Sequence, residues 1–237
     1  MSKLLYLEDS YLKKFQARVI KVNYENKYIV LDRTAFYPAG GGQPCDFGTI
    51  EFDGITSNIT MVKRIEEEIC HYLDGVIPEI DSSITGILDW ERRYNLMRTH
   101  TALHIMSAVV WRDYQVLVTG GNMEPLSGRL DFEFEHLTQQ IVTEIEEKVN
   151  TEIAQGKIVS SRTISREEAN KIPDLIRTKV NLLPDSLKQI RVVEIEGLDL
   201  QADGGTHVNN TSEIGKFRIV KFKSKGKINK RIKIEIF

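Results

Sequence analysis

The chain has 237 residues, of which 41% are hydrophobic and 28% are charged, and its formal net charge is -2. This composition excludes an intrinsically disordered protein and allows one large core or two modest ones. No segment approaches the roughly 20 apolar residues of a membrane-spanning helix, and the N-terminus lacks the apolar stretch of a signal peptide. With two cysteines and no CxxC motif, we expect a cytoplasmic protein without a membrane partner.

The first 90 or so residues have the pattern of short β-strands. Residues 17–22 are rich in β-branched side chains, and residues 28–31 form a short apolar run. Turn-forming glycines recur at Gly48, Gly54 and Gly75. Short strands separated by such turns are typical of a small barrel or curled sheet. We therefore predict a β-rich, barrel-like N-terminal domain over residues 1–88.

In the second part of the chain, the apolar residues follow a helical spacing. One stripe predicts a long helix over residues 90–114, and another predicts a second helix over residues 141–153. Thr138 is placed to cap this second helix and Gly156 to end it. A capping-box sequence at residues 165–168 predicts a short third helix.

Segments of strand type occur between and after these helices, at residues 130–135, 190–196, 217–222 and 231–236. Strands and helices mixed in this way indicate an α+β domain whose helices pack on an antiparallel sheet. We assign this domain to residues 89–237. Because no obvious linker precedes it, we expect the two domains to pack closely.

The long predicted helix contains two histidines four residues apart, His100 and His104. Side chains at this spacing lie one above the other, with Cβ atoms roughly 5–6 Å apart. Two imidazoles so placed can converge on one metal ion. The motif alone is weakly specific, because two partly buried helix histidines without a metal have the same spacing.

A second polar group is Asp203-Gly-Gly-Thr-His207. Its glycines allow a tight bend, so that both ends can face one point, although a surface turn between strands has the same composition. Three of the five histidines of the chain fall in these two short segments. Together the segments offer three imidazoles and one carboxylate, and a catalytic zinc site typically has three protein ligands and one open position.

A third segment is rich in glycine. Between Leu31 and Gln43 it contains Gly40, Gly41 and Gly42 in succession, which allow a ligand to approach the backbone closely. The segment has neither the Gly-Lys-Ser/Thr of a P-loop nor the spacing of a dinucleotide-binding motif. A long β-hairpin turn is the alternative that the pattern alone favours.

Positive charge gathers near the C-terminal end. Between Lys216 and Lys233 there are nine lysines or arginines and no acidic residue. A phosphate-binding surface and a solvated, lysine-rich strand both fit such a run.

These segments resemble the free-standing alanyl-tRNA editing proteins of the AlaX type and the editing domain of alanyl-tRNA synthetases. The matching motifs are Asp32-x-Thr34-x-Phe36-Tyr37 with Gly41-Gly42-Gln43, His100-x-x-x-His104, Gly204-Gly205-Thr206-His207, Thr211-Ser-Glu-Ile-Gly215 and Lys225-Gly-Lys. The match is ordered and runs from about residue 5 to residue 237. The glycine-rich N-terminal domain makes the chain similar to the medium-length form of the family.

The resemblance implies an ATP-independent hydrolase that removes a wrong amino acid from alanine tRNA, with serine expected first and glycine second. It implies one zinc ion per chain, held by His100, His104 and His207. Thr34 matches a family position credited with distinguishing serine from alanine, and Gln43 matches a position near the site. We therefore take Thr34 and Gln43 as the candidate catalytic residues.

One position departs from the family, which usually has Cys-Gly-Gly-Thr-His where this chain has Asp203. A carboxylate can bind zinc at about 2.0–2.2 Å, but it is a harder ligand than a thiolate. Asp203 is therefore a further candidate ligand. Its alternative roles are to hold a water molecule or to orient His207.

The expected partner is alanine tRNA charged with serine or glycine. The residues expected to contact it are Gly40, Gly41, Gly42, Lys225, Lys227, Lys230 and Arg231. Two other classes of function stay open: a tRNA-binding module without catalysis, and a metal-dependent hydrolase of a small ester or amide. The oligomeric state cannot be read from the sequence.

Overall fold

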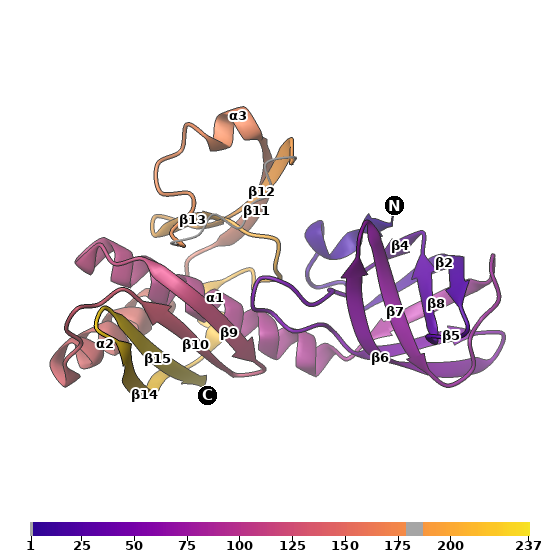
Figure 1. Ribbon diagram of the computed structural model, residues 1–237, viewed down its shortest axis with the longest axis horizontal. Helices are drawn as coiled ribbons and strands as arrows, with labels where there is room; N and C mark the ends of the chain where they lie inside the picture. Colours follow the sequence, from indigo (N-terminus) through magenta and orange to yellow (C-terminus); the bar gives the residue numbers. More distant parts are fainter. Residues whose placement is uncertain (1, 179–186) are drawn as a thin grey trace. The chain divides into compact units, whose positions relative to one another are not determined.

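The computed structural model describes residues 2–178 and 187–237 (Figure 1). The chain divides into two compact units, Met1–Asn95 and Leu96–Phe237, and the division falls within helix α1 (Trp90–Tyr114). Whether residues 1–88 and 89–237 also fold as separate domains stays a prediction. Among the described residues, no helix is long and apolar enough to cross a membrane.

The first unit is built around a closed antiparallel barrel in which the strands pair in the order β2-β3-β7-β6-β5-β8. Their bounds are β2 (Lys14–Asn23), β3 (Tyr28–Leu31), β5 (Gly48–Phe52), β6 (Ile55–Ile65), β7 (Glu68–Asp74) and β8 (Ser83–Leu88). Buried and exposed residues alternate along β2, so Phe15, Ala17 and Val19 enter the core. Closure leaves the barrel without free edges. This confirms the predicted barrel-like fold of the N-terminal part.

The chain enters the barrel through short elements. Strand β1 (Lys3–Leu4) pairs in parallel with β4 (Arg33–Thr34), and the 3-10 helix η1 (Leu5–Leu7) follows β1. Thr34 therefore lies in a strand, and its side chain is fully buried.

The three glycines form a tight turn. The backbones of Gly40 and Gln43 exchange hydrogen bonds of 3.0 and 2.9 Å, and Gly41 and Gly42 between them have φ angles of 58° and 89°. Positive φ at both central residues is the feature of a type I′ turn, which side chains disfavour. The segment is therefore a tight turn closed by an isolated β-bridge and not a β-hairpin, since the flanking strands pair elsewhere, β4 with β1 and β5 with β6 and β8. Contact of these glycines with a ligand stays a prediction.

A buried ion pair holds the base of this glycine-rich segment. Arg93, near the start of α1, is fully buried and pairs with the equally buried Asp46. Its guanidinium also donates to the carbonyl oxygens of Ala35, at 2.6 Å, and Ser10, at 3.0 Å. A buried charge is costly unless it is paired and hydrogen-bonded in this way. Because Ala35 and Asp46 flank the turn, Arg93 holds both arms of the segment.

The second unit contains two antiparallel sheets, ordered β14-β15-β10-β9 and β11-β12-β13. The strand bounds are β9 (Val118–Glu124), β10 (Ser127–Phe132), β11 (Val159–Ser165), β12 (Gln189–Ile195), β13 (Asp199–Ala202), β14 (Phe217–Gly226) and β15 (Asn229–Ile236). Helix α2 (Gln139–Ala154) packs against β14, where Asn150 exchanges hydrogen bonds with the backbone of Phe217. The predicted α+β class, with helices on an antiparallel sheet, is confirmed.

The helices begin where the capping signals predict. Thr138 accepts a hydrogen bond from the backbone of Ile141 at the start of α2. Ser165 and Glu168 form the expected capping box at the start of α3 (Arg166–Ala169). A further 3-10 helix, η2 (Thr211–Ile214), begins at a second capping box.

The apolar pattern locates the strands less accurately than the helices. Strand β10 begins three residues before the predicted start of residue 130, because its pairing with β9 and β15 includes Ser127 and Gly128, which carry no apolar signal. The pattern also missed β9, β11 and β13. These strands are defined by their pairing with neighbouring strands and not by a regular spacing of apolar residues.

His71 on β7 generates a prediction about stability. Burial lowers the pKa of this histidine to about 4, whereas in the unfolded chain the pKa is about 6.5. At a pH between these two values, His71 is protonated in the unfolded chain and neutral in the folded chain. The free energy of unfolding should therefore fall as the pH is lowered from about 6.5 to about 4, at up to ~1.4 kcal/mol per pH unit for this group.

Urea unfolding of the wild type and of His71→Gln at several pH values from 7 to 4 isolates this contribution, because all other titrating groups are shared. The variant should have the flatter dependence on pH. Parallel curves would show that His71 does not titrate as its burial implies.

Candidate metal centre

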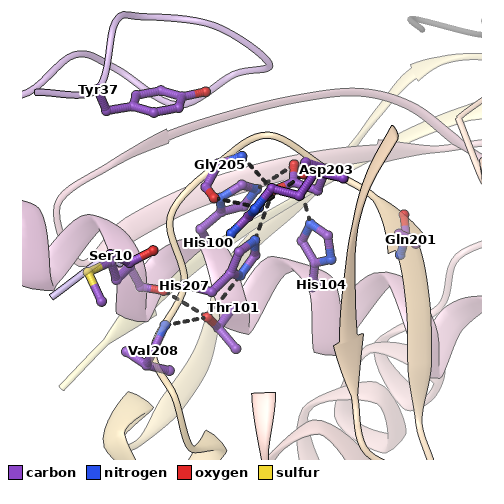
Figure 2. A network of polar contacts seen from close by, with 12 residues as sticks. Ser10, Tyr37, His100, Thr101, His104, Gln201, Asp203, Gly205, His207 and Val208 are labelled. Atoms are coloured by element: carbon purple, nitrogen blue, oxygen red, sulfur yellow. Dashed lines mark hydrogen bonds and ion pairs between the residues drawn. The ribbon is translucent and has the colours of Figure 1, made fainter. Parts of the chain in front are cut away.

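Four ligating side chains converge in the second unit. His100 and His104 come from α1, and Asp203 and His207 come from the segment that follows β13. One donor atom from each lies within 4.8 Å of the others, and the imidazoles face the Asp203 carboxylate (Figure 2). The imidazole ring centroids are 4.3 to 4.9 Å apart. The two sequence motifs therefore form one site.

The segment carrying Asp203 and His207 is shaped by its own hydrogen bonds. The backbone N–H of Gly205 donates to Asp203 Oδ2 at 2.6 Å. Arg191 on β12 donates to the carbonyl oxygens of Asp203 and Gly205, both at 3.0 Å. The segment thus folds around one guanidinium group. One carboxylate oxygen is held by the backbone, and Oδ1 is turned toward the helix.

A threonine orients His207. The Thr101 hydroxyl donates to the carbonyl of Met97 at 2.9 Å, and its oxygen lies 3.1 Å from His207 Nδ1 and accepts from the backbone N–H of Val208. These contacts hold the imidazole with Nε2 directed to the site. Burial lowers the pKa of His207 to about 4, so the ring is neutral at pH 7.

His207 also contacts the carboxylate of the site. Its Nε2 lies 3.0 Å from Asp203 Oδ2, within hydrogen-bonding distance. Burial also lowers the pKa of His100, and although burial alone would raise that of Asp203, the facing His100 and His207 lower it. Neutral imidazoles and an ionised carboxylate are the forms that bind metals.

A second carboxylate lies behind His104. Asp199 on β13 is buried, and its Oδ2 is 3.7 Å from His104 Nδ1, a nitrogen that is itself buried without a hydrogen-bond partner. Burial alone would lower the pKa of His104, but the carboxylates of Asp199 and Asp203 raise it. Arg177, at 2.5 Å, and Gln201, at 2.7 Å, hold Asp199 in place. Sequence reasoning missed Asp199, because only the pairing of β12 with β13 places it beside α1.

The two candidate catalytic residues lie in the first unit. Thr34 Oγ1 is 2.8 Å from Nε2 of His71 and accepts from the backbone N–H of Phe36 at 3.1 Å. Gln43 closes the glycine turn and is only 2% exposed, so it is not a solvated loop amide. The structure brings together the four metal-site residues, and it places Thr34 and Gln43 in the other unit.

The predicted basic contacts divide into two pairs. Lys225 and Lys227 are exposed near the end of β14. Lys230 donates instead to backbone carbonyls of the turn, at 3.0 and 2.8 Å. Arg231 forms two hydrogen bonds of 2.7 Å with Asp131 on β10. The positive charge of Arg231 is therefore already paired within the chain.

Two family models match the chain. The threonyl and alanyl tRNA synthetase second additional domain matches residues 190–233, and the class II (A) tRNA synthetases match residues 6–92. The chain is 38% identical to the alanyl-tRNA editing protein AlaX-M of Methanosarcina barkeri and 39% identical to that of Saccharolobus solfataricus, with 98% of each chain aligned. It is also 35% identical to the alanine–tRNA ligase of Pyrobaculum neutrophilum, over 92% of this chain and 25% of the ligase.

The geometry predicts that the purified protein binds about one divalent cation per chain. His104→Ala removes one of three imidazole ligands and should lower the affinity at least tenfold, since metal sites depend on ligand number and charge. Elemental analysis and competition with a chelator measure both quantities. His136→Ala is the matched control, because this histidine is exposed and lies outside the site.

Asp203→Cys tests the fourth position in the same assay. A thiolate is the softer ligand, so zinc binding should be kept or strengthened. Full metal binding by the variant lacking all three histidines would contradict the assignment.

Proposed function

This chain belongs to the AlaX-M family of alanyl-tRNA editing proteins, and on this premise we propose that it hydrolyses alanine tRNA mischarged with serine or glycine. The observation that carries the proposal is the convergence of three imidazoles and one carboxylate in the second unit. Cleavage of an aminoacyl ester requires an activated water and stabilisation of the negative charge on the carbonyl oxygen. Removal of the wrong amino acid in this way would serve the fidelity of translation.

We propose zinc as the ion, held by His100, His104 and His207 with Asp203 as the fourth ligand. Bound there, zinc would supply a Lewis acid that activates water or polarises the ester carbonyl. Asp203 Oδ1 is 3.7 Å from His100 Nε2 and 4.0 Å from His104 Nε2. Because Oδ2 is held by the Gly205 N–H, Oδ1 is the oxygen that we assign as the ligand.

Selection of the amino acid is assigned to the first unit. The wrong amino acid, serine, differs from alanine by one hydroxyl. A site that hydrogen-bonds this hydroxyl can reject the analogue that lacks it, by about 10⁴–10⁵ in the best cases. Thr34 is the residue that we propose to read the hydroxyl, and Gln43, buried at the end of the glycine turn, is the second candidate.

A deacylation assay with serine-charged and alanine-charged tRNA tests the function and the role of Thr34 together. The wild type should hydrolyse serine-charged tRNA and leave alanine-charged tRNA intact. His100→Ala should hydrolyse neither substrate at a rate comparable to that of the wild type on serine-charged tRNA. Thr34→Val keeps the shape and removes the hydroxyl, so loss of one hydrogen bond of about 0.5–1.5 kcal/mol should lower the serine-to-alanine ratio about two- to tenfold.

Binding of tRNA without release of any amino acid would instead support a binding module. Hydrolysis of small esters alone would support the small-ester hydrolase. An unchanged ratio in Thr34→Val, with the wild type active, would transfer the selective role to Gln43.

The tRNA contact that we propose is a basic face on β14 and β15, formed by Lys221, Lys223, Lys225 and Lys233 together with Lys227 of the turn between the two strands. In the register of β14 and β15, Lys221 is opposite Lys233. Like charges directly opposite each other destabilise a sheet. A face that retains such a pair is suited to an anionic ligand such as the phosphates of tRNA.

This contact predicts a dependence on salt. Each phosphate neutralised by the protein releases counterions, so tRNA affinity should fall steeply as salt is raised. The double variant Lys225→Ala/Lys227→Ala should bind tRNA more weakly. It should also reduce the slope of log affinity against log salt concentration, by up to about one for each of its two lysines that contacts a phosphate. The serine-to-alanine ratio should be nearly unchanged, because phosphate contacts do not identify the amino acid.

The matched control is Lys148→Ala/Lys171→Ala, which removes the same charge from lysines that lie beside Asp113 and Glu167. Measurements of tRNA affinity at several salt concentrations compare the two double variants with the wild type. Equal slopes in all three proteins would mean that the basic face is a solvated surface.

A further inference from the structure

Asp199 is a buried carboxylate of the second unit that stands outside the candidate ligand set. It is the first residue of β13 and follows the tight turn from β12, in which the backbone N–H of Leu198 donates to the carbonyl of Ile195 at 2.9 Å. Its side chain is only 1% exposed, and it is not one of the four residues whose donor atoms converge. A buried charge is costly unless it is paired and hydrogen-bonded, so its partners indicate what it does there.

Three donors surround this carboxylate. Arg177 donates to Oδ1 of Asp199 at 2.5 Å, and the side-chain amide of Gln201 donates to Oδ2 at 2.7 Å. His104 Nδ1 lies 3.7 Å from the same Oδ2, about 0.5 Å beyond the usual range of an N–H···O bond. A carboxylate oxygen has two lone pairs. The bond from Gln201 therefore leaves Oδ2 one lone pair for His104.

The backbone around Asp199 holds the carboxylate in place. The segment that carries its partner Arg177 is bound on two sides. The carbonyl of Arg177 accepts from the N–H of Val118 at the start of β9, and the carbonyl of Leu175 accepts from the N–H of Ala202 on β13, both at 3.1 Å. The carboxylate is therefore the fixed member of its contact with α1, and the imidazole, which can rotate about its side-chain bonds, is the member that it can orient.

The imidazoles of the site share one orientation. All three direct Nε2 to the Asp203 carboxylate, at 3.7 Å from His100, 4.0 Å from His104 and 3.0 Å from His207. The opposite nitrogen of His104, Nδ1, is buried and has no hydrogen-bond partner within the described part of the chain. A buried nitrogen without a partner costs free energy, and Asp199 offers the acceptor that this nitrogen faces.

We propose that Asp199 is a positioning residue of the metal centre: it accepts the Nδ1 proton of His104 and so holds Nε2 toward the metal. The inference rests on the proposed zinc site and deepens it. A ligating histidine binds a metal through one nitrogen, and a carboxylate on the other nitrogen fixes the tautomer and the orientation of the ring. With its Nδ1 proton bound to Asp199, His104 presents Nε2 alone as a ligand.

A purely structural role is the competing explanation, because the ion pair with Arg177 could by itself account for a buried carboxylate. In that case the loss of Asp199 lowers the stability of the fold, and zinc affinity falls only as far as the chain unfolds. A positioning role predicts two further effects in a chain that is still folded: weaker zinc binding, and weaker protection of the proton on His104 Nδ1.

Asp199→Asn tests this role on the whole chain, with zinc as the probe. Asparagine keeps the shape but has a single accepting oxygen, which cannot serve Arg177 and His104 at the same time. Zinc affinity, measured by competition with a chelator, should fall about 10- to 100-fold, the usual effect of losing such a partner. Saturating zinc should still give about one ion per chain, and urea unfolding without zinc measures the stability of the variant.

Asp131→Asn is the matched control. Asp131 is a buried carboxylate of the same unit, and it accepts two hydrogen bonds of 2.7 Å from Arg231. The control therefore removes an ion pair of the same kind, on a strand outside the candidate ligand set. It should lose stability and keep the zinc affinity of the wild type.

Nitrogen-15 NMR of histidine-labelled, zinc-loaded protein gives a second readout that wild-type protein alone can supply. The His104 signals, identified by their absence in His104→Ala, should show zinc on Nε2 and a proton on Nδ1 that exchanges slowly with water. In Asp199→Asn the same proton should exchange faster, because it has lost its acceptor. A structural ion pair between Asp199 and Arg177 would leave this exchange rate unchanged.

The outcomes separate this inference from the proposed function. Wild-type zinc affinity in Asp199→Asn, or an equal loss in Asp131→Asn, overturns the inference and leaves zinc binding and deacylation intact. Ligation of zinc through Nδ1 of His104 in the wild type overturns it as well, even if the variant does not fold. A wild type that binds zinc but releases no amino acid from tRNA refutes the proposed function alone, and a wild type that binds no zinc refutes both.

Discussion

The second unit depends on a half-buried carboxylate that faces three imidazoles. Asp203 Oδ2 is 3.0 Å from His207 Nε2, and Oδ1 is 3.7 Å from His100 Nε2 and 4.0 Å from His104 Nε2. Donor atoms gathered in this way are suited to a divalent metal ion. The supporting contacts maintain the arrangement: Arg191 bends the segment, Gly205 holds one oxygen, and α1 supplies His100 and His104.

Asp203 stands where the resemblance to the family leads us to expect a cysteine, and the local structure accommodates it. A carboxylate has two oxygens, and here they have different surroundings, one bound to the backbone of Gly205 and the other facing His100 and His104. A thiolate has one sulfur and could not use both contacts. An aspartate can therefore orient the turn through one oxygen and, in the metal site that we propose, offer the other oxygen as a harder ligand than sulfur.

The first unit buries several polar side chains in pairs, within the closed barrel and in the segments beside it. Arg93 and Asp46 form a buried ion pair that holds the arms of the glycine turn, and His71 and Thr34 form a buried hydrogen bond. Buried polar groups are favourable only when each has its partner. Burial and the hydrogen bond to His71 therefore restrict the rotation of the Thr34 hydroxyl far more than exposure on a surface strand would.

Much of the local structure was determined by the sequence itself. Helix α1 occupies the predicted residues 90–114, Thr138 caps α2, and the consecutive glycines make the tight turn. Helix periodicity, capping and positive φ are properties of a few neighbouring residues, so they can be read without the fold. The four candidate ligands were likewise found from short motifs, and the structure assembles all of them.

Only the tertiary structure decided which groups act on those residues. Asp199 lies behind His104, His71 binds Thr34, and Asp131 pairs with Arg231. In each case the partners are brought together by strand pairing or by packing on a helix, across 37 residues for His71 and Thr34 and 100 residues for Asp131 and Arg231. A shift of one residue in strand register would reverse the side that every side chain faces. The charges and hydrogen bonds of the site therefore depend on pairings that the order of the residues does not reveal.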